Sequence, residues 1–498
     1  MTDMLKREAT GSINDQAIEH VELSTDGPRE KSKAEKRLVL KQDFLITTLL
    51  SGAFFFAYLD RGAIGNARLL GFQESLNLSD HQYFNCLALF FVGYMAFEFP
   101  ALILIRKLHA PTIYGFCTII FGVAAIGTAY ATTYAEIIIL RLILGCGEAV
   151  VQSAFVYMSL WYRREELSAR AGNVYLTTPL AGAVAGIIAH YVGANLDGAH
   201  GLRSWQWLFI IEGIPTIAWG ILMWTLMPRL PDKEVNSNYS LFFRSEEERR
   251  LIILRLVEGR NVMDARVSWP QVLLALKDVK TWLMAYITAS IGLALAAFGV
   301  FLPTFIKAFG FSPLTTQLYS IIPYGSAFIS LIVVSRIVDS FNKRAIPLLI
   351  LVAIAIAGFI LLITTTNRVA LVVGATLINV AVYPSIVICA AWIPSNHAGY
   401  TKRATAFSVL QVFIQSFSIA GTQIYNTPPR FLKGHGVLLG LLSLCLVTIL
   451  VVCWIMKKSN NKKDQEAAVW RERGEVNPAE SESLETLCDA HPNYRYVY

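Results

Sequence analysis

The hydrophobic residues of this chain gather in long stretches that polar segments separate. Twelve stretches each approach the ~20 apolar residues that a helix needs to cross the hydrocarbon layer of a membrane. They form two groups of six, with a polar segment between the groups. The pattern predicts an all-α integral membrane protein built as two six-helix bundles. The expected spans are 43–63, 82–105, 112–130, 136–159, 171–192 and 205–227 in the first bundle, and 281–302, 315–338, 345–365, 369–391, 404–425 and 436–456 in the second.

The polar segments divide the chain into five expected parts. Between the bundles, Ser245 and Glu248 have the spacing of a capping box, and the apolar residues after them predict one amphipathic helix on the membrane surface. We interpret this helix as a linker that joins the bundles. The five parts are an N-terminal tail (1–42), the first bundle (43–227), the linker (228–280), the second bundle (281–456) and a C-terminal tail (457–498).

The composition narrows the class of protein. Only 16% of the residues are charged, against about a quarter in soluble proteins, which excludes an ordinary soluble enzyme and a disordered scaffold. The net charge of +7 comes from basic residues scattered through tails and loops, with no basic face of the kind that binds nucleic acid. We therefore expect the lipid bilayer, and no nucleic acid, as a partner. The seven cysteines lie mostly in apolar stretches without a CxxC motif, so we expect no disulfide framework, metal site or cofactor.

The basic residues also predict the orientation, because cytoplasmic loops carry an excess of Lys and Arg. Of the 43 Lys and Arg residues, two fall inside predicted spans and six in loops on the outer side. The others fall in the tails, the linker and the inner loops, so we expect both termini to be cytoplasmic. Asn77 begins a glycosylation sequon in an outer loop, too near the membrane for us to expect its use. The outer basic residues are Arg68, Arg203, Lys307, Arg368, Arg430 and Lys433.

Two arginines inside the spans are the main candidates for chemistry. Arg61 lies in the first span and Arg141 in the fourth, where an arginine costs about 2.5–3.5 kcal/mol on insertion scales. Asp60 neighbours Arg61, and Glu148 follows Arg141 by seven residues, which places both on one helix face. We expect the two guanidinium groups to bind one carboxylate substrate, while Asp60 or Glu148 exchanges a proton. The alternative is structural: ion pairs from Asp60 to Arg141 and from Arg61 to Glu148 would lock the two spans together.

Other polar residues in the spans are weaker candidates. We expect Glu98 and Glu212 to serve in gating or packing, and His190 to be solvated near the outer end of its span. A further set either lines a central cavity as part of the substrate site or makes hydrogen bonds between helices. This set comprises Asn85, Tyr94, Thr177 and Thr178 in the first bundle, and Asn379, Tyr383, Gln411 and Gln415 in the second.

Two loops suggest that the halves arose by duplication. The connection after the second span, 105–111, and the one after the eighth, 335–344, are both short, basic and cytoplasmic in the expected orientation. They resemble the signature loop of the major facilitator superfamily, which has an acid and basic residues at these sites. The second copy contains the acid, Asp339, for which the resemblance implies a gating or structural role. The first copy lacks it.

Several motifs resemble the anion:cation symporter family of that superfamily, and within it the fungal branch of allantoate, nicotinate, pantothenate and biotin permeases. The resemblance implies roles in anion binding and proton coupling for Asp60, Arg61, Arg141 and Glu148. The histidine that some relatives have in the second span is absent, and Leu87 stands there. The motifs are 58–61 with 64–67, 90–94 with 98–100, 141–148, 159–162, 207–213, 302–306 and 401–405.

Together these features predict a proton-coupled importer of a small organic carboxylate, working by alternating access as a monomer. We expect it in the plasma membrane of a fungus-like cell, with a small organic anion and a proton as its partners. An exporter of an acidic metabolite and a transporter-like nutrient receptor are the alternatives. A membrane enzyme would need a nucleophile or metal ligands gathered at one face, and the eight histidines are dispersed.

Overall fold

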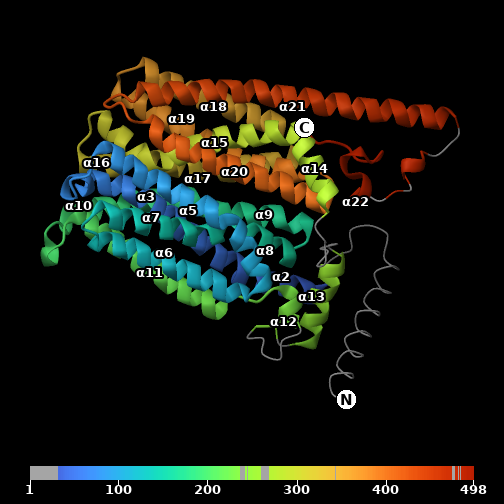
Figure 1. The fold of residues 1–498 in the computed structure, drawn as a ribbon, viewed down its shortest axis with the longest axis horizontal. Coiled ribbons are helices and arrows are strands. Elements are labelled where there is room, and N and C mark those ends of the chain that lie inside the picture. Colours follow the sequence, from blue (N-terminus) through green and yellow to red (C-terminus); the bar gives the residue numbers. More distant parts are fainter. Residues whose placement is uncertain are drawn as a thin grey trace.

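The structure is a computed structural model that describes residues 32–235, 242–243, 245–258, 268–341, 344–473, 477–480, 482 and 484–498. The described part is helical throughout and contains no strand (Figure 1). Twelve helical segments in it are long and apolar enough to cross a membrane. The predicted fold class, an all-α membrane protein with twelve spans, is confirmed.

The first half supplies six of these segments. The first span is one continuous helical path through α2, the π-helical segment η1 and α3, and the fourth and fifth spans each consist of two helices. The helices are α2 (Lys33–Gln42), η1 (Asp43–Thr47), α3 (Thr48–Leu69), α4 (Phe72–Ser75), α5 (Asp80–Lys107), α6 (Ala110–Tyr130), α7 (Tyr134–Gln152), α8 (Ala154–Trp161), α9 (Arg164–Tyr175), α10 (Thr177–Asn195) and α11 (Ser204–Leu226).

The second half supplies the other six segments, and its last helix runs well beyond the predicted end at residue 456. In the segment between the halves, the structure describes three helices where the sequence predicted one. The linker helices are α12 (Pro231–Val235), α13 (Glu246–Glu258) and α14 (Trp269–Lys277). The others are α15 (Val279–Ala308), α16 (Pro313–Tyr319), α17 (Ile321–Phe341), α18 (Ala345–Thr364), α19 (Arg368–Ser395), α20 (Tyr400–Ile424), α21 (Leu432–Glu472) and α22 (Leu484–Leu487).

Side-chain hydroxyls explain the break within the fifth span. Pro179 has no N–H to donate to the Tyr175 carbonyl one turn earlier. The Thr178 hydroxyl donates to that carbonyl instead, at 2.9 Å, and the Thr177 hydroxyl donates to the Val174 carbonyl at 2.7 Å. The helix is therefore interrupted between α9 and α10 without leaving these carbonyls unsatisfied.

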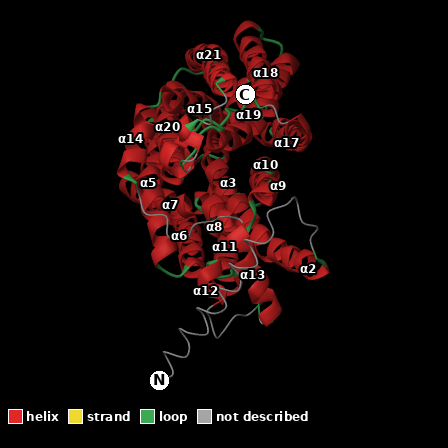
Figure 2. Ribbon diagram, turned by 90° about the vertical axis from the view of Figure 1, so that its right-hand side faces the viewer, coloured by secondary structure: helices red, strands yellow, loops and turns green. Residues whose placement is uncertain are grey.

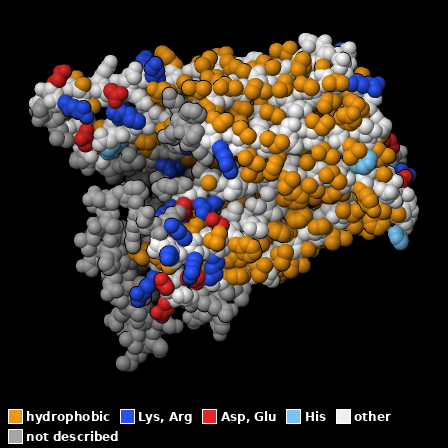
Figure 3. All heavy atoms as spheres, turned by 180° about the vertical axis from the view of Figure 1, so that it is seen from behind, with side chains coloured by type: hydrophobic (Ala, Val, Ile, Leu, Met, Phe, Trp, Pro, Cys, Tyr) orange, Lys and Arg blue, Asp and Glu red, His pale blue; other side chains and the backbone are white. Residues whose placement is uncertain are grey.

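The helices of each half lie together as one group. Seen from the end at which α2 begins and the chain ends, α15 and α17–α21 form the upper group and α3, α6–α8 and α11 the lower group (Figure 2). Hydrophobic side chains cover the long flank of the bundle, and charged side chains gather mainly at its ends (Figure 3). This distribution suits a bundle whose flanks face lipid.

Glycines allow close contact between α5 and α7. A Cβ on Gly93 would lie 2.5 Å from the Leu142 carbonyl oxygen, and one on Gly145 would overlap the Phe90 carbonyl oxygen. The room that Gly145 leaves is therefore filled by the backbone of a neighbouring helix. Because these glycines hold α5 and α7 in register, they fix the position of Arg141 and Glu148 on α7.

The two halves meet tightly at the end of the bundle away from the termini, where α10 and α16 lie (Figure 1). A Cβ on Gly186 would lie 2.7 Å from the Gln317 carbonyl oxygen of the other half. His190 Nδ1 is 2.9 Å from the Leu314 carbonyl oxygen, so this residue contacts the second half rather than solvent alone. Gln423 donates to the Phe84 carbonyl at 3.2 Å. These contacts close that end of the interface between the halves.

Candidate functional site

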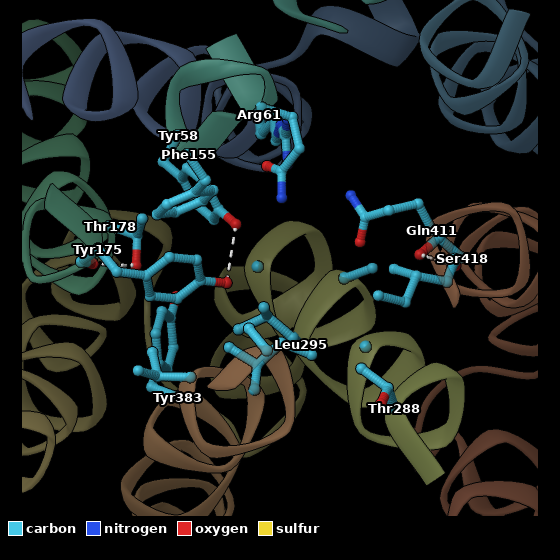
Figure 4. Close-up of a pocket in the computed structure, with 18 of the residues that line it drawn as sticks. Tyr58, Arg61, Phe155, Tyr175, Thr178, Thr288, Leu295, Tyr383, Gln411 and Ser418 are labelled. Carbon is cyan, nitrogen blue, oxygen red and sulfur yellow. Dashed lines mark hydrogen bonds between the residues drawn. The ribbon is translucent and has the colours of Figure 1, made fainter. Parts of the chain in front are cut away.

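A cavity of about 800 Å³ lies between the two halves. Its volume falls within the roughly 300–1,000 Å³ of small-molecule sites. Tyr162, Leu167, Arg344 and Arg403 line it toward the end with the termini, so the cavity reaches that end while the opposite end is closed. In Figure 4, Arg61 borders the cavity from the first half, and Gln411 and Ser418 face it from the second.

Arg61 is a charged group of the first half that is partly open to this cavity. Its Nε donates to Oε2 of Glu148 at 2.7 Å, and the side chain is 21% exposed, whereas that of Glu148 is fully buried. The guanidinium carbon lies 4.7 Å from the ring centre of Tyr58 and 4.9 Å from that of Tyr94. Because the ion pair engages Nε, the outer edge of the guanidinium can still accept an anion from the cavity.

The arrangement matches one of the two ion pairs that the structural alternative predicted. Arg61 pairs with Glu148, but no hydrogen bond joins Arg141 to Asp60 in the described structure. Both Asp60 oxygens, and Nε and Nη2 of Arg141, are buried without a hydrogen-bond partner there. Arg141 lines the cavity but is only 2% exposed, and its guanidinium lies 5.7 Å from the Phe209 ring centre.

Five of the other predicted residues line the cavity: Tyr94, Thr178, Tyr383, Gln411 and Gln415. The Tyr94 hydroxyl donates to Gln152 at 3.5 Å. The hydroxyl of Thr178 is engaged by its own helix, as described above. Their presence on the wall makes contact with a bound molecule possible, and their role in binding stays a prediction.

Three predicted cavity residues, Asn85, Thr177 and Asn379, do not line the cavity, and the Thr177 hydroxyl donates to the Val174 carbonyl instead. The Asn85 amide is 3.4 Å from the Tyr134 hydroxyl, near the closed end of the bundle. The Asn379 amide donates to the Ala375 carbonyl of its own helix at 2.9 Å. Asn85 therefore lies in contact with another helix, whereas Asn379 bonds within its own helix, which neither alternative predicted.

The predicted gating residues lie in three different settings. Glu98 accepts a hydrogen bond of 2.7 Å from Gln411, which joins α5 of the first half to α20 of the second. Glu212 is fully buried in α11 and does not reach the cavity. The side chain of Asp339 lies outside the described part of the structure.

Most of the aromatic wall of the cavity was not predicted. The Tyr58 and Tyr175 hydroxyls are 3.2 Å apart, and Phe155 lines the same cavity as the predicted Tyr383 (Figure 4). Tyr324 lines it as well. The position of Tyr58, three residues before Arg61 on the same helix, could have indicated its place. No sequence signal places Tyr175, because its position depends on the break between α9 and α10.

No group of three or more His, Cys, Asp and Glu side chains that could hold a metal ion occurs among the described residues. The polar groups that line the cavity are guanidinium groups, amides and hydroxyls, and aromatic rings lie between them. A guanidinium with an aromatic surround can bind a carboxylate whose organic part is planar and apolar.

The chain is similar to transporters by both sequence and structure. The Major Facilitator Superfamily matches residues 50–422. The high-affinity nicotinic acid transporter of Saccharomyces cerevisiae is 28% identical over 494 residues, covering 95% of this chain and 86% of that protein. A transporter of Schizosaccharomyces pombe is 28% identical over 470 residues, covering 93% and 90%.

The fold agrees with these matches. The proton:xylose symporter XylE superposes with a TM-score of 0.63 at 14% sequence identity, covering 83% of this chain and 95% of that one. At this identity the likeness shows the fold alone. The family match extends over most of the twelve spans, including every residue of the candidate site. The chain therefore belongs to the Major Facilitator Superfamily, and it is a membrane transporter rather than an enzyme.

Proposed function

We propose that this chain is a proton-coupled importer of a small organic carboxylate, working by alternating access of its two halves. The observation that carries the proposal is the Arg61 guanidinium, which borders the cavity between the halves while paired to a buried carboxyl group. A fixed cation at a cavity inside a membrane protein favours an anionic ligand. In the proposed orientation both termini are cytoplasmic, the membrane is the plasma membrane, and the cavity opens to the cytoplasm.

The surroundings of Arg61 favour a nitrogen-containing ring acid as substrate. The rings of Tyr58 and Tyr94 would pack against a planar substrate whose carboxylate meets the guanidinium. Across the cavity, Gln411, Gln415 and Ser418 supply neutral hydrogen-bonding groups for a heteroatom. Similarity to a nicotinic acid transporter supports nicotinate as the first compound to test.

The ion pair suggests how a proton is coupled to this anion. With Glu148 ionised, its carboxylate competes with the substrate for Arg61. Protonation of Glu148 would weaken the pair and release the guanidinium for the substrate carboxylate. Loss of the proton toward the cytoplasm would restore the pair and expel the substrate. Each transported anion would thereby bring a proton with it.

Uptake of radiolabelled nicotinate into cells that lack their own carriers tests the proposal. We expect accumulation driven by an inward proton gradient, which an uncoupler abolishes, and weak competition by nicotinamide, which lacks the carboxylate. Glu148→Gln should abolish accumulation against a gradient, because the side chain can no longer exchange a proton. The matched control is Glu74→Gln, an exposed acid outside the spans, which should leave uptake unchanged.

Two results would contradict the proposal. Equal transport of nicotinamide and nicotinate would remove the anion requirement. Unchanged accumulation by the Glu148→Gln variant would remove Glu148 from coupling. If nicotinate is not transported, a panel of other radiolabelled vitamins and nitrogen-containing acids is tested with the same gradient, and failure of every acid would refute carboxylate import.

A further inference from the structure

A cluster of charged side chains extends from Arg61 into the interior of the first half. It contains more acidic than basic residues. It consists of Asp60 and Arg61 on α3, Arg141 and Glu148 on α7, and Glu212 on α11. Asp60 is 1% exposed, and Glu148 and Glu212 are fully buried. Three carboxyl groups and two guanidinium groups therefore lie together, and every one of them except that of Arg61 is buried. With every group ionised, the cluster would carry one net negative charge.

Helix packing brings Glu212 to the depth of Asp60. The antiparallel helices α3 and α11 meet where Gly52 contacts the ring of Trp219, and Phe56 lies 5.8 Å from the same ring. Asp60 comes eight residues after Gly52, and Glu212 comes seven residues before Trp219. Because both helices rise 1.5 Å per residue, the two carboxyl groups lie at nearly the same level.

The charged groups that interact with Glu212 belong to the same cluster. Glu212 interacts electrostatically with Asp60 and with Arg141. The α6 backbone packs on α11 at Gly213, and α6 has no titratable residue between 117 and 130. In α10 the titratable residues are His190 and Tyr191, near the closed end of the bundle.

Neither carboxyl group is compensated by hydrogen bonds. Both oxygens of Asp60 and both oxygens of Glu212 are buried without a donor among the described residues. A buried carboxylate with no hydrogen bond is strongly disfavoured relative to its neutral form. Two such groups that share the influence of one arginine, Arg141, cannot both be ionised without a large electrostatic cost.

We propose that Glu212 is a second proton-binding site of this transporter, acting with Asp60 behind the substrate cavity. The inference rests on the proposed function and extends it. With one proton bound the cluster is neutral, and a bound substrate carboxylate gives it a single negative charge. Without that proton the occupied cluster would carry two. The anion therefore binds more tightly to the protonated protein, and the proton to the occupied protein.

This coupling differs from that of Glu148. Glu148 competes with the substrate for Arg61 by direct contact, whereas Asp60 and Glu212 do not line the cavity. Arg141 does line it and interacts with both of them. The proton on Glu212 would thus influence the substrate through charge alone, by leaving Arg141 without an ionised partner on α11.

Infrared difference spectroscopy on the reconstituted protein tests the site without any substrate. Lowering the pH should produce the C=O stretching band of a protonated buried carboxylic acid, and Glu212→Gln should remove part of that band. The matched control is Thr216→Val, because Thr216 is fully buried one turn away and its hydroxyl bonds only to the Glu212 carbonyl oxygen, at 2.8 Å. It should leave the band unchanged. A band of full size in Glu212→Gln would overturn the proposal.

Transport measurements separate this inference from the proposed function. Glu212→Gln mimics the protonated acid, so it should keep exchange of internal for external nicotinate and lose part of the pH dependence of nicotinate binding, while the part that depends on Glu148 remains. A pH profile equal to that of the parent would refute the role of Glu212 alone. If the parent itself transports no carboxylate, the proposed function fails, and the infrared result still decides whether Glu212 binds a proton.

Discussion

At the scale of single residues, one guanidinium organises the candidate site. Arg61 has a buried carboxylate on one side and tyrosine rings around it. Removing only one partner of such a buried pair leaves a charge uncompensated, which destabilises proteins by about 3–5 kcal/mol. Shortening the Arg61 side chain would therefore lower both stability and binding, and the two effects could not be separated. A variant that retains the charge is more informative.

Arg61→Lys is that variant. Lysine can keep the charge opposite Glu148, but it cannot offer a bidentate fork to a carboxylate. We expect the KM for the transported acid to rise about tenfold or more, since a lost charged hydrogen bond costs about 1.5–3 kcal/mol. Arg203→Lys, at an exposed position in a loop, is the control. An unchanged KM would show that Arg61 does not contact the substrate.

At the scale of helices, glycine contacts and helix breaks position these residues. Gly145→Ala would force a methyl group into the Phe90 carbonyl oxygen and to within 2.9 Å of the Tyr94 backbone nitrogen. We expect a loss of about 1–3 kcal/mol of stability, as for other overpacked sites, measured as a lower unfolding temperature in detergent. Gly440→Ala is the control, because a Cβ there meets open space. Equal stability of both variants would contradict the close packing of α5 and α7.

A second feature at this scale is the docking of the C-terminal segment against the second half. Asp489 accepts hydrogen bonds of 2.6 Å from the Ala398 backbone N–H and from Lys402. Lys402 also donates to Asp278 at 3.0 Å. Near the chain end, the Trp392 indole donates to the Val497 carbonyl at 2.7 Å. These contacts fasten the segment to the end of the bundle where the cavity opens.

We predict that Asp489→Asn loosens this segment. Because the Lys402 contact is a buried charged one, a loss of about 1–3 kcal/mol in docking is expected, visible as faster limited proteolysis of the segment. The exposed pair of Asp464 and Arg495, 2.9 Å apart, should contribute little, so Asp464→Asn is the control. Equal cleavage of the two variants would show that Asp489 does not hold the segment.

The contact of Lys402 with Asp278 should depend on pH. Burial alone would raise the pKa of Asp278, but Lys280 and Lys402 outweigh it and lower that pKa. A carboxyl group with a lowered pKa in the folded state stabilises it at neutral pH, above its usual value near 3.9. This contribution is lost as the pH falls through the lowered pKa. The contribution of Asp278 to stability, measured as the difference in unfolding temperature between the parent and Asp278→Asn, should therefore be constant around neutrality and disappear only in acid.

At the scale of the whole molecule, the two halves are closed at one end and leave a cavity toward the other. Alternating access requires the closed end to open. Gly186→Leu places a large side chain against Gln317 and Ser320. The Gln317 carbonyl oxygen and the Ser320 hydroxyl oxygen would each lie 2.7 Å from a Cβ at position 186. We expect this variant to favour the state that is open at that end.

Labelling with a membrane-impermeant thiol reagent measures this shift. A cysteine in place of Ser320, in a background without other cysteines, should react severalfold faster from the outside when Gly186→Leu is present. Gly436→Leu, where a side chain meets open space, should have no effect. Labelling that does not respond to Gly186→Leu would contradict a gate at this contact.

The sequence by itself determined the class of protein, the number of spans and the depth of the charged residues. Because the hydrocarbon layer favours long apolar stretches and disfavours charges, both features can be recognised in the sequence without coordinates. It also predicted that Arg61 and Glu148 could pair. The tertiary structure alone decided that this pair forms while Asp60 and Arg141 remain without a hydrogen bond between them.

The structure also decided which polar residues face the cavity. The Tyr175 hydroxyl lies 3.2 Å from that of Tyr58, and the Asn379 amide donates within its own helix. Such choices depend on how helices far apart in the chain rotate and approach, which hydrophobic periodicity leaves open when nearly every face of a helix is apolar. Glu212 shows the same limit, since only the packing of α11 on α3 places it beside Asp60.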